Sequence, residues 1–279
     1  MRALPVLVTG ATGRTGRHVV SQLLAKNVPV RALVRDPNTA GLPPQVEVFR
    51  GDLTRPETFD RCLDGIDAVF LVWCAPVDSA APVIERIAKR ARRIVFLSSP
   101  HKTPHPLFQA ARPNPISQLH EEIERLIRVS GLEWTFLRPG MFAANALWWW
   151  APQIRAGNVV RWPYALSPSA PIDERDIAAV AVEALGESTI PQTDLVLTGP
   201  ESLTHLDQVT IIGDVLGRSL RYEEIAPEDW LRDPISNMLL TAWAAVIGQP
   251  ALITPTVGEI TGRPSRTFRD WVKDNAAKF

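Results

Sequence analysis

Short apolar runs alternate with amphipathic stretches through the first half of the chain. Apolar runs bounded by turn residues are typical of strands buried on both faces of a sheet. The predicted strands are Pro5–Thr9, Val30–Val34, Val46–Arg50, Ala68–Trp73, Ile94–Ser98 and Thr135–Arg138. The predicted helices between them are Arg14–Lys26, Pro56–Leu63, Pro82–Arg92 and Ser117–Ser130, the last with a Ser117 cap and a stop at Gly131. Because strands that alternate with helices form a parallel sheet, we expect an α/β fold, a Rossmann-type doubly wound sheet of six strands.

The pattern changes after Pro139, where aromatic residues and prolines replace the regular alternation. The predicted helices of this part are Asp173–Leu185, Leu203–Leu216, Pro227–Val246 and Thr267–Ala277, with short strands near Leu195 and Tyr222. We therefore expect a first domain over residues 1–140 and a smaller mixed α/β lid over residues 141–279, interleaved with the first in one compact unit.

The composition is that of an ordinary globular protein: 279 residues, 46% apolar and 22% charged. Thirty basic residues balance thirty acidic ones, so the field on which nucleic-acid and anionic-membrane binders rely is missing. Cys62 and Cys74 form neither a disulfide framework nor a zinc motif, and the first strand leaves no room for a signal peptide. We expect a cytoplasmic monomer or homodimer that binds a small apolar or aromatic molecule, with no metal, nucleic acid or membrane.

A glycine-rich loop, Thr-Gly-Ala-Thr-Gly-Arg-Thr-Gly, lies at residues 9–16 between the first strand and the first helix. Glycines permit a tight turn and a close backbone approach to a pyrophosphate, and the helix start offers free N–H groups to the anion. The alternative is a tight turn without a ligand. The pattern favours a dinucleotide-binding domain over residues 1–140, with contacts from Gly10, Thr12, Gly13, Arg14, Thr15 and Gly16.

Arg35 follows the second predicted strand, where an acidic residue would select NAD(H) by binding a ribose hydroxyl. A guanidinium at this position can instead bind the 2′-phosphate of NADP(H), and Arg14 can add a second contact. Alternatively, Arg35 pairs with Asp36 on the surface, and Arg14 is a solvated residue at the helix start. We expect NADP(H) as the cofactor.

Three further residues follow strands and are candidates for cofactor contact. Asp52 and Leu53 come after the third strand, where a carboxylate can accept from the adenine amino group; the alternative for Asp52 is a helix cap. Ser98 ends the fifth strand, and either contacts the nicotinamide end of the cofactor or closes a local turn.

Several segments together resemble the NmrA-like family of atypical short-chain dehydrogenases/reductases. The similar segments are the glycine loop and residues 32–36, 51–53, 130–140, 171–178, 197–200 and 262–268. The family comprises NADP(H)-binding quinone and azo-dye reductases, natural-product tailoring reductases, and regulators that bind the dinucleotide without turning it over. The resemblance implies a Rossmann fold, an NADP(H) cofactor and a cofactor contact at Pro139.

The chain departs from the family where relatives keep Tyr-x-x-x-Lys. Tyr164 and Tyr222 are its tyrosines, and neither is followed by lysine four positions later. His120 and Glu124 take the corresponding places, four residues apart on one helix face. An imidazole oriented by a carboxylate can donate a proton to a substrate oxygen. The pair can equally contact the ribose or be purely structural.

An aromatic cluster follows the last predicted strand of the sheet, where ligands of doubly wound sheets bind. Met141, Phe142 and Trp149 are the candidates for contact with a flat, apolar substrate, and lid packing is the alternative. We expect an NADP(H)-dependent reductase of a carbonyl, quinone or conjugated aromatic molecule. A regulatory protein that senses NADP(H) without catalysis, and a redox-neutral isomerase or cyclase, stay open as alternatives.

Overall fold

The computed structural model describes residues 4–186, 190, 192–230 and 233–279. The chain divides into two compact units, each made of three segments. Unit 1 comprises Met1–Ser99, Pro115–Arg138 and Glu174–Leu195, and unit 2 comprises Pro100–Asn114, Pro139–Asp173 and Val196–Phe279. These units differ in two main places from the expected domains, 1–140 and 141–279. Residues 100–114 pack in unit 2, and residues 174–195 pack in unit 1.

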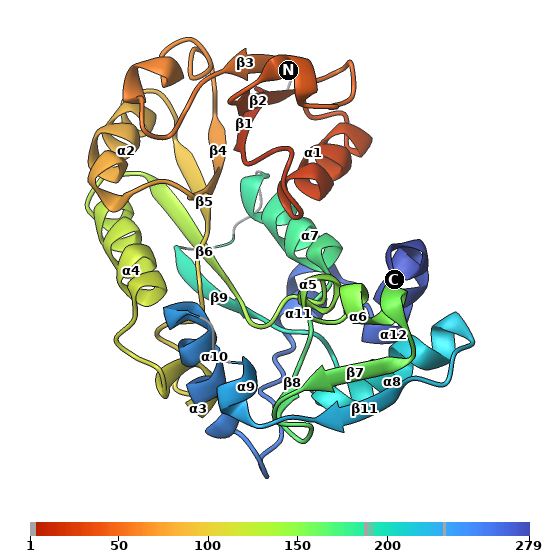
Figure 1. Ribbon diagram of the computed structural model, residues 1–279. Helices are drawn as coiled ribbons and strands as arrows, with labels where there is room; N and C mark the ends of the chain where they lie inside the picture. The colour runs from red at the N-terminus through yellow and green to blue at the C-terminus, as the bar shows by residue number, and fades with distance from the viewer. Residues whose placement is uncertain (1–3, 187–189, 191, 231–232) are drawn as a thin grey trace. The chain divides into compact units, whose positions relative to one another are not determined.

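A seven-stranded sheet in the order β3-β2-β1-β4-β5-β6-β9 confirms the expected doubly wound α/β fold (Figure 1). Its strands are β1 (Val6–Thr9), β2 (Val30–Val34), β3 (Glu47–Arg50), β4 (Ala68–Val72), β5 (Arg93–Leu97), β6 (Glu133–Pro139) and β9 (Thr193–Leu197). The five pairings from β3 to β6 are parallel. The expected number of six strands is wrong, because the strand near Leu195 extends this sheet beside β6 instead of belonging to a separate lid.

Helices cover both faces of the sheet in unit 1. They are α1 (Gly16–Ala25), α2 (Ala80–Ala88), α4 (Pro115–Arg128) and α7 (Glu174–Leu185), with 3-10 turns η1 (Pro37–Thr39), η2 (Pro56–Phe59) and η3 (Val77–Ser79). In Figure 1, α2 and α4 lie together on one side of the sheet and α1 and α7 on the other. Gln22 in α1 donates to the Arg175 carbonyl in α7 at 3.0 Å. This hydrogen bond is one of the contacts along which α1 and α7 pack together, and α7, expected in the lid, thus belongs to unit 1.

Two predicted helices of this unit differ from the structure. The predicted helix 56–63 is only the 3-10 turn η2, in which the Asp60 N–H donates to the Glu57 carbonyl three residues back. Helix α4 begins at Pro115, whose fixed φ suits a first helical position. Ser117 is therefore a buried residue within the helix instead of its cap.

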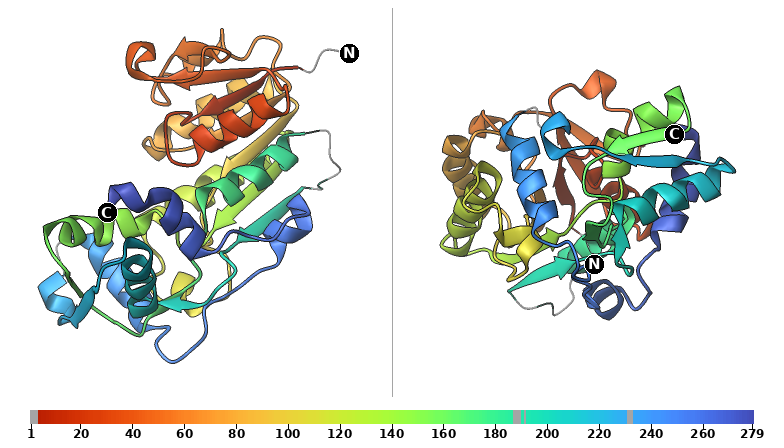
Figure 2. Two further views of the ribbon diagram at one scale, coloured as in Figure 1. Left: turned by 90° about the vertical axis from the view of Figure 1, so that its right-hand side faces the viewer. Right: turned by 60° about the horizontal axis from the view of Figure 1, so that its bottom comes forward.

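Unit 2 consists of two small sheets and several helices. Strand β7 (Val159–Trp162) runs parallel to β11 (Arg221–Glu224), as Figure 2 shows, and β8 (Pro168–Ser169) pairs with β10 (Leu203–Thr204). The helices are α3 (Pro106–Gln109), α5 (Asn145–Trp149), α6 (Ala151–Ala156), α8 (His205–Leu216), α9 (Pro227–Trp230), α10 (Pro234–Ala244), α11 (Thr256–Thr261) and α12 (Phe268–Asn275), followed by the 3-10 turn η4 (Ala276–Lys278).

The predicted helix 227–246 is two helices, α9 and α10; residues 231 and 232 lie outside the described part of the chain. Asp233 caps α10, because its carboxylate accepts from the Ser236 N–H while the Ser236 hydroxyl accepts from the Asp233 N–H. Among the described residues, none of the helices is both long and apolar enough to cross a bilayer.

Candidate functional site

The loop between β1 and α1 leaves no room for a side chain at its closest approach. Gly10 adopts a left-handed φ of 62°. A Cβ on Gly16 would lie 2.1 Å from the Gly10 carbonyl oxygen, and one on Gly13 would lie 3.0 Å from the same atom. The turn brings the start of α1 against the end of β1, which is the geometry that the glycine pattern predicts.

The start of α1 suits an anion. Thr15 precedes the helix without a side-chain cap, and the first turn holds no acidic residue. The Arg17 N–H donates to the Gly13 carbonyl and the His18 N–H to the Thr15 carbonyl, so it is mainly the positive dipole end of α1 that favours a phosphate. Thr12 and Arg14 are exposed in the preceding loop, whereas Thr15 is buried.

Arg17 holds this loop in shape, and sequence reasoning missed it. Its Nε donates to the Gly13 carbonyl at 3.1 Å and its Nη2 to the Thr12 carbonyl at 2.8 Å. Thr9 fixes the start of the loop, because its hydroxyl accepts from the Val72 N–H of β4 at 2.8 Å. The contact joins a side chain to backbone carbonyls of the loop, so a sequence pattern of side chains did not reveal it.

Two exposed guanidinium groups follow neighbouring strands. Arg35 comes directly after β2, and Arg50 ends β3 in register with Val34. Neither arginine has a hydrogen bond or ion pair within the described residues. The alternative that Arg35 pairs with Asp36 is wrong. The Asp36 carboxylate instead accepts from the Asn38 N–H and from the Thr39 hydroxyl, both in η1. Arg50 could have been found from sequence, since adjacent parallel strands end at one sheet edge.

Asp52 closes a local turn. Its Oδ1 accepts from the N–H and the hydroxyl of Thr54, both at 2.8 Å. These hydrogen bonds, helped by the positive charge of Arg35, hold the pKa of Asp52 below its usual range. Leu53 is half-buried against the core of unit 1. Contact of Asp52 and Leu53 with an adenine stays a prediction.

Ser98 is held by a buried carboxylate. Its hydroxyl donates to Glu124 Oε1 at 2.7 Å. Arg138 donates from Nε to Oε1 at 3.0 Å and from Nη2 to Oε2 at 2.6 Å, and Arg128 adds a bond to Oε2 at 3.2 Å. Glu124 is 0% exposed and Arg138 4%. Asp194 pairs with both arginines, so the network is charge-balanced around Glu124.

His120 is one turn from Glu124 in α4, but Glu124 does not orient it. The His120 Nδ1 lies 2.8 Å from the Ile116 carbonyl oxygen, and the ring stacks on Phe96 at 5.8 Å. Since a carbonyl only accepts, the neutral ring carries its proton on Nδ1 and leaves Nε2 as an acceptor. Burial lowers the pKa of His120. The expected orientation is wrong because the Glu124 oxygens bind Ser98 and the two arginines; the proton-donor role stays a prediction.

In unit 2, the residues after β6 are tied to a neighbouring segment. Pro139 ends β6, and the next N–H, that of Gly140, donates to a carbonyl of β9 at 2.8 Å. The Ile172 N–H donates to the Met141 carbonyl at 2.9 Å, and Phe142 forms a bridge with Ile172. Met141 packs against the core of unit 2. Ligand contacts of Pro139, Met141 and Phe142 stay predictions.

The three successive tryptophans have three different surroundings. Trp148 is 75% exposed, Trp150 is fully buried, and Trp149 is half-buried between them. Trp148 and Trp149 line a hollow of about 580 Å³ in unit 2, together with Trp162 and Trp230. We call it the tryptophan hollow. Its indole faces suit a flat aromatic molecule.

Comparison with known proteins places these features in a family. Residues 10–188 match the NAD(P)H-binding family. The chain is 39% identical to the (4-alkanoyl-5-oxo-2,5-dihydrofuran-3-yl)methyl phosphate reductase of Streptomyces griseus, over 98% of this chain and 99% of that protein. It is 30% identical to the NAD(P)H azoreductase of Xenophilus azovorans, over 98% of this chain and 99% of that protein.

A solved structure gives the same picture of the fold. The Escherichia coli NADPH-dependent quinone oxidoreductase QOR2, complexed with NADPH, superimposes with a TM-score of 0.79. The match covers 96% of this chain and 99% of that chain at 24% identity. At this identity the likeness shows the Rossmann-type fold alone, which agrees with the strand order observed here.

Proposed function

The chain belongs to the NAD(P)H-binding family, and on that premise we propose that it is an NmrA-like atypical short-chain reductase that uses NADP(H) to reduce a carbonyl, quinone or other conjugated aromatic small molecule. The observation that carries the proposal is the β1–α1 turn, where a Cβ on Gly16 would fall 2.1 Å from a backbone oxygen. Two relatives of 30% identity or more are named as reductases.

The residues of unit 1 fit a dinucleotide. The glycine loop packs its own backbone so closely that a Cβ at Gly16 would strike the Gly10 carbonyl, and α1 starts without a capping carboxylate. In our proposal, the loop N–H groups and Thr12 bind the pyrophosphate, Asp52 and Leu53 contact the adenine, and Ser98 contacts the nicotinamide half. NADP(H), when bound, supplies the hydride.

The preference for NADP(H) over NAD(H) is part of this proposal. Arg35 and Arg50 lie at the ends of neighbouring strands, are exposed, and form no hydrogen bond or close ion pair with a carboxylate within the described residues, although the charge of Arg35 reaches Asp52. Two guanidinium groups at one sheet edge suit a phosphate dianion, since each offers paired N–H donors. We assign Arg35 to the 2′-phosphate, with Arg50 and Arg14 as further contacts.

Ser98 has a defined role in this scheme. Its hydroxyl donates to the Glu124 carboxylate, which only accepts while it is ion-paired with Arg138. The hydroxyl oxygen of Ser98 therefore has only its lone pairs left to offer to a ligand. We assign Ser98 to hold an N–H or O–H group of the cofactor, with Glu124 and Arg138 as its positioning residues.

On the substrate side, we assign Met141, Phe142 and Trp149 to contact with the apolar part of the substrate. Trp149 supports this assignment most directly, since it lines the tryptophan hollow. The relatives' names describe an oxo-dihydrofuran phosphate and azo compounds as substrates. A conjugated cyclic ester, an azo dye and a quinone are accordingly the compounds to try first.

The proposal is tested by adding NADPH and one compound from this panel to the purified protein and following nicotinamide absorbance. We expect loss of absorbance that depends on both protein and compound. Gly16→Ala should weaken NADPH binding by about 10-fold or more, because the added Cβ meets the Gly10 carbonyl. Gly157→Ala is the matched control, since a Cβ there meets nothing within 4 Å.

The alternatives give different results in the same assay. A regulatory sensor binds NADPH in the wild type but never oxidises it, whatever the compound. A redox-neutral isomerase converts its substrate while the NADPH absorbance stays constant. Absence of NADPH binding, or equal binding by wild type and Gly16→Ala, would refute the assignment of the loop.

A further inference from the structure

A second hollow in unit 2 contains a tyrosine in a strained backbone conformation. Tyr164 has a φ of 53°, which lies in the left-handed region of backbone conformations. Residues other than glycine, asparagine and aspartate rarely adopt this region, because their Cβ crowds the backbone. Its surroundings fix this conformation: the Ser167 N–H donates to the Tyr164 carbonyl at 3.0 Å, and the Ala165 N–H donates to Glu224 Oε1 at 3.3 Å. Strained conformations of this kind cluster at active sites and ligand-binding segments, so Tyr164 is a candidate for a functional side chain.

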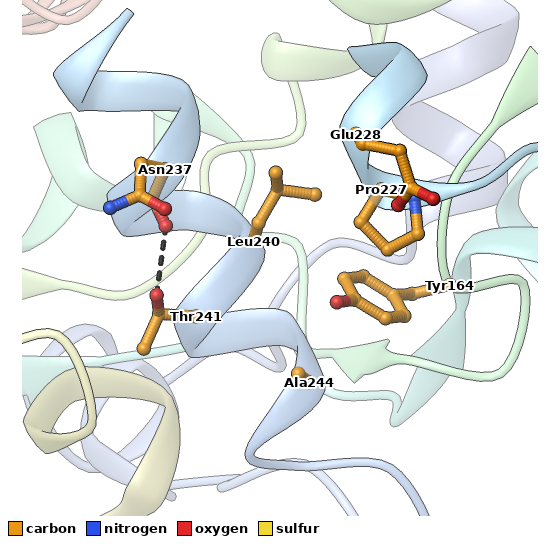
Figure 3. Close-up of a pocket in the computed structure, with 7 residues that line it drawn as sticks. All are labelled: Tyr164, Pro227, Glu228, Asn237, Leu240, Thr241 and Ala244. Carbon is orange, nitrogen blue, oxygen red and sulfur yellow. Dashed lines mark hydrogen bonds between the residues drawn. The ribbon is translucent and has the colours of Figure 1, made fainter. Parts of the chain in front are cut away.

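Figure 3 shows what this conformation achieves. The Tyr164 ring forms one wall of a hollow of about 410 Å³, and its hydroxyl points across the hollow toward α10. Pro227 and Glu228 of α9 form a second wall. The opposite wall is one face of α10, with residues spaced three and four apart: Asn237, Leu240, Thr241 and Ala244. We call this the Tyr164 hollow.

Some polar side chains of the hollow already form hydrogen bonds within the protein, and others do not. The Thr241 hydroxyl donates to the Asn237 carbonyl at 2.9 Å, the dashed line in Figure 3. The Tyr164 hydroxyl and the Glu228 carboxylate have no partner within the described residues. The other tyrosine is different, because the Tyr222 hydroxyl donates to the Pro163 carbonyl at 3.2 Å. Tyr164 thus offers a free donor, and Glu228 a free acceptor.

The chemistry of the walls defines the ligand. Pro227, Leu240 and Ala244 are apolar, and the seven residues that line the hollow include a carboxylate but no lysine, arginine or histidine. A phosphate, sulfonate or carboxylate group placed there would face Glu228 without a counter-charge. An uncharged molecule with a carbonyl oxygen for Tyr164 and a hydroxyl for Glu228 satisfies both polar groups.

We propose that the Tyr164 hollow binds an uncharged, amphipathic carbonyl compound, with Tyr164 donating to the carbonyl oxygen and Glu228 accepting from a hydroxyl. The identification of this compound as the substrate rests on the proposed reductase function. The tryptophan hollow, on which the assignment of Trp149 to the substrate rests, is the competing site, and the two hollows are rival positions for the same compound. The tryptophan hollow lies against Ser236 and Leu239, a different face of α10 from Asn237 and Leu240, so variants separate the two hollows.

The test uses two anthraquinones that differ in one substituent, 2-(hydroxymethyl)anthraquinone and anthraquinone-2-sulfonate. Their dissociation constants are measured on the full chain with and without NADP⁺. We expect the uncharged compound to bind about 10-fold or more tightly than the sulfonate. Tyr164→Phe, which removes one hydroxyl, should weaken the uncharged compound about 3- to 10-fold. Glu228→Gln should strengthen binding of the sulfonate and so reduce the difference between the dissociation constants of the two compounds.

Tyr222→Phe is the matched control, because it removes the hydroxyl that is already bonded within the protein. It should leave both dissociation constants unchanged. Wild-type affinity in Tyr164→Phe would overturn the proposal, as would tight binding of the sulfonate. Loss of affinity in Trp149→Phe together with wild-type affinity in Tyr164→Phe would place the ligand in the tryptophan hollow instead.

The same variants separate this inference from the function on which it rests. Tyr164→Phe should leave the dissociation constant of NADPH unchanged. If the inference fails while the wild type still oxidises NADPH with a quinone, the reductase function stands and only the site is wrong. If the uncharged compound binds through Tyr164 but no compound of the panel oxidises NADPH, the site stands and the reductase function fails.

Discussion

Arg138 binds both carboxylate oxygens of Glu124 in the interior of unit 1, at 2.6 Å and 3.0 Å. Both side chains are almost fully buried. The pair joins the end of β6 to the middle of α4, and it gives Ser98 a fixed acceptor. A buried ion pair adds little net stability compared with apolar packing, but removing one partner leaves a buried charge that costs far more.

Glu124→Gln should therefore lower the free energy of unfolding by about 3 kcal/mol, because the Arg138 guanidinium loses its main counter-charge in the interior. Urea unfolding measures this loss. Glu122→Gln is the control on the same helix: Glu122 binds Arg125 on the surface at 2.6 Å, and its substitution should cost less than about 1 kcal/mol. Equal losses in the two variants would contradict a structural role for the buried pair.

The sheet could be predicted well from the sequence because its strands are locally marked. Val30–Val34 matches β2 residue for residue, since apolar residues end there at a charged turn. The sequence alone could not place Thr193–Leu197, which became the last strand of the sheet. A short apolar run does not reveal which strand it pairs with, because that depends on contacts distant in sequence.

The site was predictable in the same uneven way. The glycine loop and Arg35 follow rules of local geometry, and the structure gives them the expected backbone setting. The four-residue spacing of His120 and Glu124 suggested a pair, but spacing shows which residues share a helix face and not what packs against it. Arg138, from β6, provides the counter-charge for Glu124.

Arg35→Glu should reverse the cofactor preference. A carboxylate at the end of β2 repels the 2′-phosphate of NADPH and can accept from the ribose hydroxyl of NADH, so the ratio of the two dissociation constants should shift by about 10-fold or more. Arg50→Ala should weaken NADPH but not NADH. Arg61→Glu, an exposed arginine of the same unit, is the control. Equal wild-type affinities for the two cofactors would rule out the assignment.

His120→Ala tests the proton-donor role against the cofactor contact. The Nδ1 proton is directed to the Ile116 carbonyl, and burial lowers the pKa of the ring, so a neutral His120 offers only an acceptor. We expect weaker NADPH binding, by roughly 3- to 10-fold, with kcat and its pH profile nearly unchanged. A fall in kcat of about 100-fold with loss of a near-neutral ionisation would instead establish His120 as the general acid.

His205 should make the stability of the protein depend on pH. The ring is 1% exposed among Trp149, Trp150 and Trp243, and its Nδ1 lies 3.3 Å from the Pro163 carbonyl. Burial lowers the pKa of His205 to about 4, from an ordinary value of 6.5.

Above about pH 6.5 the folded and unfolded states both keep this imidazole neutral, so the full stability is present. As the pH falls toward 4, only the unfolded state binds the proton, and the free energy of unfolding falls by as much as about 3 kcal/mol.

His205→Asn removes the titrating group while leaving the carboxylates in place. Urea unfolding between pH 7 and pH 4.5 should show a shallower loss in the variant, by roughly 2 kcal/mol. The variant also loses a packed ring, so its stability at pH 7 is lower, and the slope is the quantity to compare. Parallel pH profiles in the two proteins would mean that His205 is protonated equally in the folded and unfolded states.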